Sequence, residues 1–118
     1  MYKRQDLIEI GRVESALRRR PRLAARLFRP AEIEACERRA RPGRHLAARF
    51  AAKEAAIKAL GGGCSPRDIE VTGDEAPALR LHGRADELAR RLGLSLSVSM
   101  THSRESAAAV VVAGPGAG

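Results

Sequence analysis

Apolar residues change their spacing along the chain, and this change predicts its helices and strands. Residues 6–11 are short and rich in branched side chains, which predicts a strand. From there to residue 60 the pattern is typical of amphipathic helices. We expect helices over residues 12–20, 22–28, 30–39 and 45–60, with a loop over residues 41–44. Pro30 stands at a favoured first-turn position, and three consecutive glycines end the longest helix.

The second half of the chain is dominated by alternating patterns. Residues 68–72 and 78–81 predict a hairpin whose strands are joined by a loop rather than a tight turn. A helix over residues 84–92 is followed by strands over residues 95–101 and 107–113. The order is therefore strand, helices, strand, strand, helix, strand, strand. This order predicts an α+β fold with antiparallel pairing.

Length and composition fit one small domain with a core of modest size. The 118 residues include only three aromatic ones, namely Tyr2, Phe28 and Phe50. The core must then consist of leucine, isoleucine, valine and many alanines, which bury little area per residue. We therefore expect either marginal stability or stabilisation by an oligomer.

Cysteine usage and hydropathy indicate the cellular compartment in which the protein is expected. Cys36 and Cys64 are far apart and have no metal-ligand spacing, so free thiols in the cytoplasm are expected. The start of the chain does not resemble a signal peptide. No apolar run approaches the roughly 20 residues that a membrane-spanning helix needs.

Positive charge is concentrated in one part of the chain. The net charge is +8, and residues 12–44 hold eleven arginines against four carboxylates. Such polarity indicates an acidic partner, which could be a nucleic acid, a phosphorylated cofactor or an acidic protein. A merely solvated helical face in an arginine-rich proteome is the alternative.

A helical wheel of residues 45–60 places several charged residues around an apolar stripe. The stripe contains Leu46, Phe50, Ile57 and Leu60. Lys53 falls in its middle, which is costly unless the amine finds an anion or reaches water. Glu54 and Lys58 share one edge of the stripe, and Arg49 lies on the other edge. A surface ion pair between Glu54 and Lys58 is the alternative to a functional role.

Lysine usage favours a functional role for this helix. The chain has nineteen arginines and three lysines, and Lys53 and Lys58 are five residues apart. In a chain so rich in arginine, paired lysines indicate a need for a compact ammonium group rather than a planar guanidinium.

Four segments together resemble the phosphopantetheinyl transferases. Residues 50–58, Phe-Ala-Ala-Lys-Glu-Ala-Ala-Ile-Lys, resemble the family motif of an aromatic residue followed by x-x-Lys-Glu-Ala-x-x-Lys. Residues 46–50 resemble the holo-acyl-carrier-protein synthase branch. Residues 6–13, 68–79 and 97–111 resemble the first strand, the central hairpin and the last two strands of that branch. The resemblance implies one transferase domain over residues 1–118, with an antiparallel sheet and a long central helix.

The resemblance also implies a reaction and its site. A carrier-protein serine attacks the β-phosphate of coenzyme A, and adenosine 3′,5′-bisphosphate leaves. Asp6 and Glu54 would hold Mg²⁺, whose preference for oxygen ligands suits a diphosphate. Lys58 would contact the diphosphate and is a candidate for assisting removal of the serine proton, so Asp6, Glu54 and Lys58 form the expected catalytic set. The other expected coenzyme A contacts are Arg49, His102 and Ser103. His45 and His82 are interpreted as structural, and the role of Lys53 stays open.

The family resemblance gives the basic half of the chain a partner. Acyl carrier proteins are acidic, and Arg12, Arg22, Leu23 and Arg26 lie where the family's carrier-docking helix and turn are found. A homotrimer with sites between subunits is also implied. A nucleic-acid-binding module is an alternative, but the chain lacks interleaved aromatics, helix-turn-helix and zinc spacings, and we expect no nucleic-acid partner. A non-catalytic paralogue is the other alternative.

Some positions depart from the family pattern. Its first strand usually opens with Gly-Ile-Gly-x-Asp, whereas this chain reads Met-Tyr-Lys-Arg-Gln-Asp. We therefore expect residues 1–5 to be non-native and the first strand to be truncated. Ala76 replaces a common lysine, which would alter the adenine side of the pocket without affecting the metal. Residues 114–118 are expected to form a flexible tail.

Overall fold

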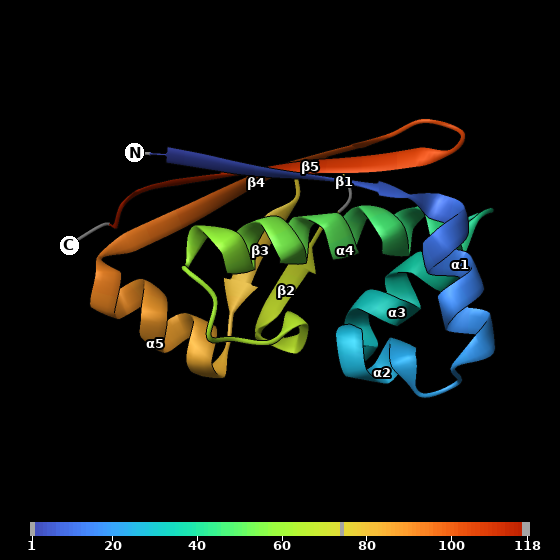
Figure 1. Ribbon diagram of the computed structural model, residues 1–118, viewed down its shortest axis with the longest axis horizontal. Helices are drawn as coiled ribbons and strands as arrows, with labels where there is room; N and C mark the ends of the chain where they lie inside the picture. The colour runs from blue at the N-terminus through green and yellow to red at the C-terminus, as the bar shows by residue number, and fades with distance from the viewer. Residues whose placement is uncertain (1, 74, 117–118) are drawn as a thin grey trace.

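A long helix, α4 (Pro42–Ala59), lies along one face of a three-stranded antiparallel sheet (Figure 1). The sheet has the order β1 (Tyr2–Glu9), β5 (Ser106–Pro115), β4 (Leu94–His102). The computed structural model describes residues 2–73 and 75–116. Because β5 is the central strand, β1 and β4 form the two edges of the sheet and flank α4 on opposite sides.

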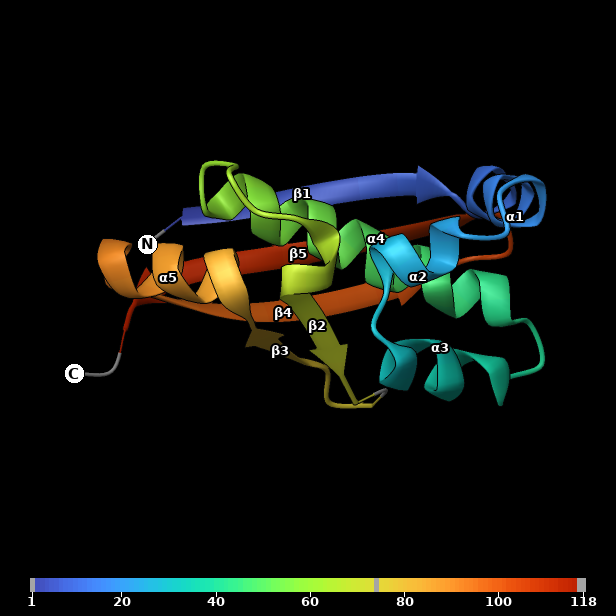
Figure 2. The ribbon, with the colours of Figure 1, turned by 90° about the horizontal axis from the view of Figure 1, so that it is seen from below.

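The remaining elements lie below α4 in the view of Figure 1. Helices α1 (Ile10–Arg19), α2 (Leu23–Leu27) and α3 (Pro30–Glu37) gather at one end. The hairpin of β2 (Ile69–Thr72) and β3 (Ala78–Leu81) forms a separate two-stranded sheet, preceded by a 3-10 turn over Pro66–Asp68. Helix α5 (Gly83–Leu92) lies at the other end (Figure 2). The predicted α+β class and element order are confirmed, although the strands divide into two sheets.

The loop predicted over residues 41–44 is wrong, because α4 begins at Pro42. Proline is tolerated in the first turn of a helix, where its missing N–H has no intrahelical partner. The Arg41 side chain binds Glu14 of α1, with Nη2 and Oε1 separated by 2.9 Å. A Cβ added at Gly43 would lie only 2.3 Å from Cγ of Glu14, so the start of α4 packs closely against α1.

The first strand of this chain is fully paired, and the expectation that its native part is truncated stays a prediction. β1 begins at Tyr2, and all eight of its residues pair with β5, from Tyr2 opposite Ala113 to Glu9 opposite Ser106. The strand ends at Glu9 rather than at residue 11, because Ile10 starts α1 and donates its N–H to the Glu105 carbonyl. Whether residues 1–5 are native stays open.

The chain end differs from the expected flexible tail as well. β5 continues through Pro115, and the Gly116 N–H donates to the Gly93 carbonyl at 2.8 Å. The rest of the predicted tail, residues 117–118, lies outside the described residues.

The core is rich in alanine, as the composition predicts, and these small side chains let α4 approach the sheet closely. Its buried face repeats alanine at positions 47, 51, 55 and 59, and the facing side of β5 presents Ala107, Ala109, Val111 and Ala113, all buried. Small side chains on both surfaces reduce the separation between helix and sheet, so that side chains at the edges of α4 reach the edge strands. None of the helices among the described residues is both long and apolar enough to cross a membrane.

The opposite face of the three-stranded sheet is uncovered by any of the described elements (Figure 1). Ala108, Val110 and Val112 alternate with the buried residues of β5 and form its middle row. On the β1 side they pair with Leu7, Gln5 and Lys3, and Leu7 is 73% exposed. On the β4 side they pair with Thr101, Ser99 and Ser97, all exposed. An apolar row flanked by small hydroxyl side chains is suited to contact with another protein surface.

Candidate functional site

Asp6, Glu54 and Lys58 meet where β1 passes beside α4. Asp6 lies on the face of β1 turned toward the helix, and its Oδ1 accepts a hydrogen bond from Lys58 Nζ at 3.0 Å. Glu54 precedes Lys58 by about one helical turn, on the same edge of α4. Lys58 therefore pairs with Asp6 across the two elements, which argues against the simple surface ion pair with Glu54. The lysine side chain remains 52% exposed and the Asp6 side chain 21% exposed, so the cluster opens to solvent.

The two carboxylates affect each other electrostatically. The pKa of Glu54 is raised, first by partial burial and second by the nearby charge of Asp6, whereas Lys58 opposes the rise. A cation between the two carboxylates would relieve this repulsion. A magnesium ion commonly takes one or two protein carboxylates and completes its shell with water and substrate phosphates. The pair Asp6 and Glu54 fits that pattern, whereas no group of three or more acidic, histidine or cysteine ligands occurs among residues 2–73 and 75–116.

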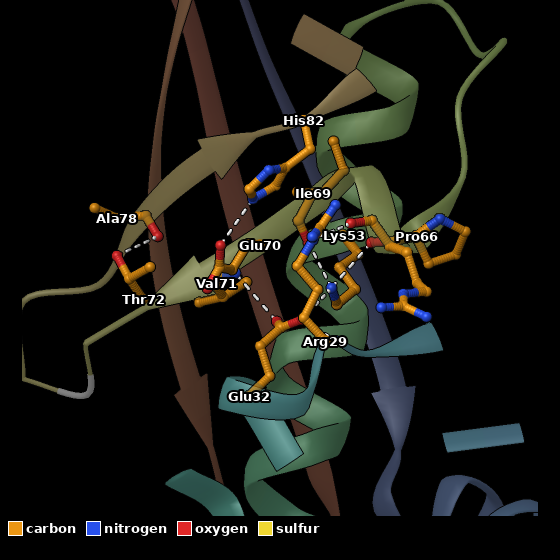
Figure 3. A network of polar contacts seen from close by, with 11 residues as sticks. Arg29, Glu32, Lys53, Pro66, Ile69, Glu70, Val71, Thr72, Ala78 and His82 are labelled. Carbon is orange, nitrogen blue, oxygen red and sulfur yellow. Dashed lines mark hydrogen bonds and ion pairs between the residues drawn. The ribbon is translucent and has the colours of Figure 1, made fainter. Parts of the chain in front are cut away.

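Lys53, whose role the sequence left open, makes structural contacts inside the protein (Figure 3). It is fully buried, and its Nζ donates to Glu32 Oε1 at 2.7 Å, to the Pro66 carbonyl at 2.9 Å and to the Ile69 carbonyl. These three acceptors use all three ammonium protons. Burial lowers the pKa of Lys53, and the adjacent Glu32 carboxylate opposes that shift.

Glu32 completes the network around Lys53. Its Oε1 also accepts the Arg29 N–H at 2.9 Å, and its Oε2 accepts the Val71 N–H at 3.1 Å (Figure 3). The ion pair therefore joins α3 and α4 to the turn before β2 and to β2 itself. Because neither side chain is more than 1% exposed, Lys53 is not available to a substrate. In the motif, Lys53 stands next to Glu54 and anchors the helix that carries Glu54.

Arg49 and His102 lie on the other side of α4, as the wheel predicts for Arg49. Arg49 is buried, and both side chains line a cavity of about 230 Å³ between α4 and the end of β4. His45, one turn before Arg49, lines the same cavity. Its ring meets that of His102 edge-on, with centroids 5.3 Å apart and an interplanar angle of 81°. Arg39, from the segment after α3, completes the basic lining.

The structure thus brings together residues that the sequence analysis had separated. His45 was interpreted as structural, although its spacing of four residues from Arg49 could have placed it on the same helical edge. Arg39 and Glu32 were missed because no local pattern links them to this helix. His82 does have a structural contact, since its Nε2 lies 2.8 Å from Glu70 Oε1.

Ser103 belongs to the turn between β4 and β5. Its Oγ accepts the Ser106 N–H at 3.2 Å and lies 3.4 Å from the Ser106 carbonyl oxygen. The side chain is exposed, and the hydrogen bonds of this turn leave it accessible. Its contact with coenzyme A stays a prediction.

The candidate docking residues lie at the end of the molecule formed by α1 and α2 (Figure 2). Arg12 is exposed, with its Nε 3.5 Å from Glu9 Oε2. Arg22 and Arg26 are also exposed, and Leu23 is half-buried between them. The four residues therefore form a basic surface with one apolar side chain.

The two functional clusters face opposite edges of the sheet. Asp6 is on β1 and His102 on β4, with β5 and the overlying α4 between them. A single ligand on one chain would have to pass around α4 to reach both. The carboxylate cluster and the basic cavity are therefore two separate candidate sites on each chain.

Comparisons with known proteins agree with this architecture. Residues 6–111 match the model of the 4′-phosphopantetheinyl transferase superfamily. The holo-[acyl-carrier-protein] synthase of Moorella thermoacetica is 52% identical over 113 residues, which cover 91% of this chain and 88% of the relative. This chain belongs to the 4′-phosphopantetheinyl transferase superfamily, as the sequence motifs indicate.

Solved structures of holo-[acyl-carrier-protein] synthases have the same fold. The Helicobacter pylori enzyme in complex with coenzyme A superposes with a TM-score of 0.81 at 30% identity, covering 96% of this chain and 100% of that one. The Bacillus anthracis enzyme in complex with coenzyme A (3′,5′-ADP) gives a TM-score of 0.77 at 30% identity, covering 98% of this chain and 96% of the other.

Proposed function

We propose that the chain transfers 4′-phosphopantetheine from coenzyme A to a serine of an apo-acyl carrier protein, with Mg²⁺ held by Asp6 and Glu54. The superfamily match and the holo-[acyl-carrier-protein] synthases among the relatives support the transferase activity. The observation that carries the site is the convergence of Asp6, Glu54 and Lys58 from β1 and α4.

The geometry suits phosphoryl transfer by positioning and charge. The serine oxygen forms a bond to the β-phosphorus, and the bond to adenosine 3′,5′-bisphosphate breaks. Mg²⁺, when bound, supplies charge neutralisation at the diphosphate. Lys58 is half exposed and ion-paired, so it acts as a mobile cation that moves from Asp6 to a phosphate oxygen. The carboxylates of Asp6 and Glu54 would hold the metal beside the diphosphate.

Mass spectrometry of the carrier protein tests the activity. An apo-acyl carrier protein incubated with the chain, coenzyme A and Mg²⁺ should gain the mass of one phosphopantetheine. Chelation of the metal should stop this gain, and added Mg²⁺ should restore it. If several bacterial carriers gain no mass, the transferase proposal is wrong. If transfer persists in the presence of the chelator, only the proposed metal requirement is refuted.

The basic surface of Arg12, Arg22, Leu23 and Arg26 is proposed to dock the acidic carrier protein. Reversing two exposed charges, Arg22→Glu with Arg26→Glu, should raise KM for the carrier about tenfold at low salt and leave kcat nearly unchanged. The effect should shrink at about 0.5 M salt, where the Debye length is only a few ångströms. A matched control is Arg90→Glu with Arg91→Glu, because it makes the same charge change on α5, at the far end of the molecule. Equal effects of the two double variants would contradict specific docking.

We further propose that the chain acts as a homotrimer with sites shared between subunits. The number three comes from the family resemblance. Two structural features support self-association: the uncovered apolar row of Ala108, Val110 and Val112, and the two candidate sites on opposite edges of the sheet. Analytical ultracentrifugation that finds only monomer under assay conditions would refute it.

A cytoplasmic location is proposed because Cys36 and Cys64 form no disulfide, which suits a reducing compartment. Labelling of both thiols in protein taken directly from cells checks this. The alternative of a non-catalytic paralogue loses its main support, since β1 is fully paired and brings Asp6 to α4.

A further inference from the structure

Lys58 connects the last turn of α4 to β1 through the carboxylate of Asp6. Its Nζ donates to Asp6 Oδ1 at 3.0 Å, and the Lys58 side chain is 52% exposed. The ammonium group can therefore leave Asp6 without opening a packed interior. Asp6 is only 21% exposed, and it belongs to a strand whose residues all pair with β5. Lys58 is thus the movable partner of this ion pair, and Asp6 is the fixed one.

The carboxylate of Asp6 is also one of the two proposed metal ligands. An ammonium ion and a divalent cation on one carboxylate repel each other, and they share its attraction. Two carboxylates and one ammonium group leave a single net negative charge where Asp6, Glu54 and Lys58 meet. A divalent cation added to this cluster would make its net charge positive. The metal should therefore bind weakly while Lys58 stays on Asp6.

We propose that Lys58 makes metal binding depend on coenzyme A, because its ammonium group competes with the metal for Asp6 until a diphosphate draws it away. This inference rests on the proposed function, since it takes coenzyme A as the diphosphate and Asp6 with Glu54 as the metal ligands. It goes beyond a phosphate contact, because it gives Lys58 an effect on the metal site before any substrate binds.

A diphosphate is a stronger partner for Lys58 than a single carboxylate. It carries two negative charges, and an ammonium group forms charge-assisted hydrogen bonds with phosphate oxygens. Once Lys58 moves, the full charge of Asp6 is available to the metal. Each ligand therefore favours binding of the other, by the same factor in both directions. The part of this factor that comes from Lys58 should be about two- to fivefold, as is usual for an exposed ion pair.

Binding of Mn²⁺ tests the proposal without any turnover. Mn²⁺ replaces Mg²⁺ as the probe because electron paramagnetic resonance counts its free ion, and binding by coenzyme A alone is measured separately and subtracted. Lys58→Met removes the ammonium group and should bind Mn²⁺ about two- to fivefold more tightly than the parent protein. With saturating coenzyme A this advantage should disappear, because the ammonium group of the parent protein then lies on the diphosphate.

Two further variants locate the effect. Lys3→Met is the matched control, because it makes the same charge change on the face of β1 turned away from α4. It should leave the affinity for Mn²⁺ unchanged with and without coenzyme A, because salt at about 0.15 M screens exposed charges that are not in contact. Asp6→Asn should weaken Mn²⁺ binding, and an unchanged affinity would contradict the shared carboxylate.

The comparison of Lys58→Met with the parent protein can overturn the proposal in two ways. If both bind Mn²⁺ equally in the absence of coenzyme A, Lys58 does not compete with the metal. If the advantage of the variant is equally large with coenzyme A, Lys58 does not couple the two ligands. If the parent protein binds no coenzyme A, the proposed function fails instead. That failure is distinguishable, because the first comparison requires only the metal.

Discussion

Glu54→Gln is expected to lower the rate of phosphopantetheine transfer by roughly a thousandfold. A metal ion supplies several kcal/mol of charge stabilisation to a transferring phosphoryl group, and each 1.36 kcal/mol corresponds to about a factor of ten in rate. The amide keeps the shape of the side chain but cannot supply a charged ligand beside Asp6. The measurement is the initial rate of mass gain by the carrier protein at saturating coenzyme A and Mg²⁺.

Thermal unfolding separates this loss of activity from a loss of structure. The pKa of Glu54 is raised above its ordinary value of 4.5, so ionisation of this carboxyl destabilises the metal-free fold. In chelator the glutamine variant should therefore melt at the same temperature as the parent below about pH 4. Its melting temperature should exceed that of the parent increasingly as the pH rises above 4.5, and the difference should be complete once the pH passes the raised pKa. Added Mg²⁺ should stabilise the parent more than the variant.

Glu87→Gln is the matched control for activity, because the Glu87 side chain is 68% exposed on α5 and belongs to neither cluster. It should retain the parental rate. A Glu54→Gln variant that keeps more than about a tenth of the parental rate would show that Glu54 is not a metal ligand in catalysis.

Lys53→Met is expected to destabilise the protein by about 3–5 kcal/mol, the usual cost of removing one partner of a buried ion pair. The methionine leaves Glu32 buried without its cation and leaves the Pro66 and Ile69 carbonyls without their donor. Urea unfolding at neutral pH measures the change. Such a loss is a large fraction of the stability of a small domain.

Two further variants distinguish the ion pair from general damage to α4. Lys58→Met removes a half-exposed lysine from the same helix and should change the free energy of unfolding by less than about 1 kcal/mol. Glu32→Met combined with Lys53→Met removes both charges and should recover part of the lost stability. A Lys53→Met protein as stable as the Lys58→Met protein would contradict the anchoring role.

The motif residues differ in how far their roles could be read from the sequence. The wheel places Glu54 and Lys58 on one edge and Arg49 on the other, and the structure confirms both edges. The wheel also places Lys53 in the apolar stripe, and the structure shows that the Lys53 side chain is buried. The partner of Lys53 could not be predicted, because Glu32 lies 21 residues earlier and is brought near only by the packing of α3 against α4.

His45 shows the same limit for the basic cavity. A lone histidine on a helix is usually structural, and only the pairing of β4 with β5 brings His102 against it. The start of α4 was misplaced for a similar reason. Its first turn depends on the contact of Gly43 and Arg41 with Glu14, which no local pattern contains.

The sequence by itself determined the family, the α+β class, the order of elements and the helix that carries Glu54 and Lys58. These follow from hydrophobic period and local motif, which act over a few residues. Only the tertiary structure decided that β1 is fully paired and delivers Asp6 to Lys58, that Lys53 is an internal anchor, and that His45 joins the basic cavity. Each of these depends on contacts between residues distant in the chain. Small alanine side chains on α4 let β1 and β4 approach its two edges, and the packing of α3 against α4 brings Glu32 to Lys53.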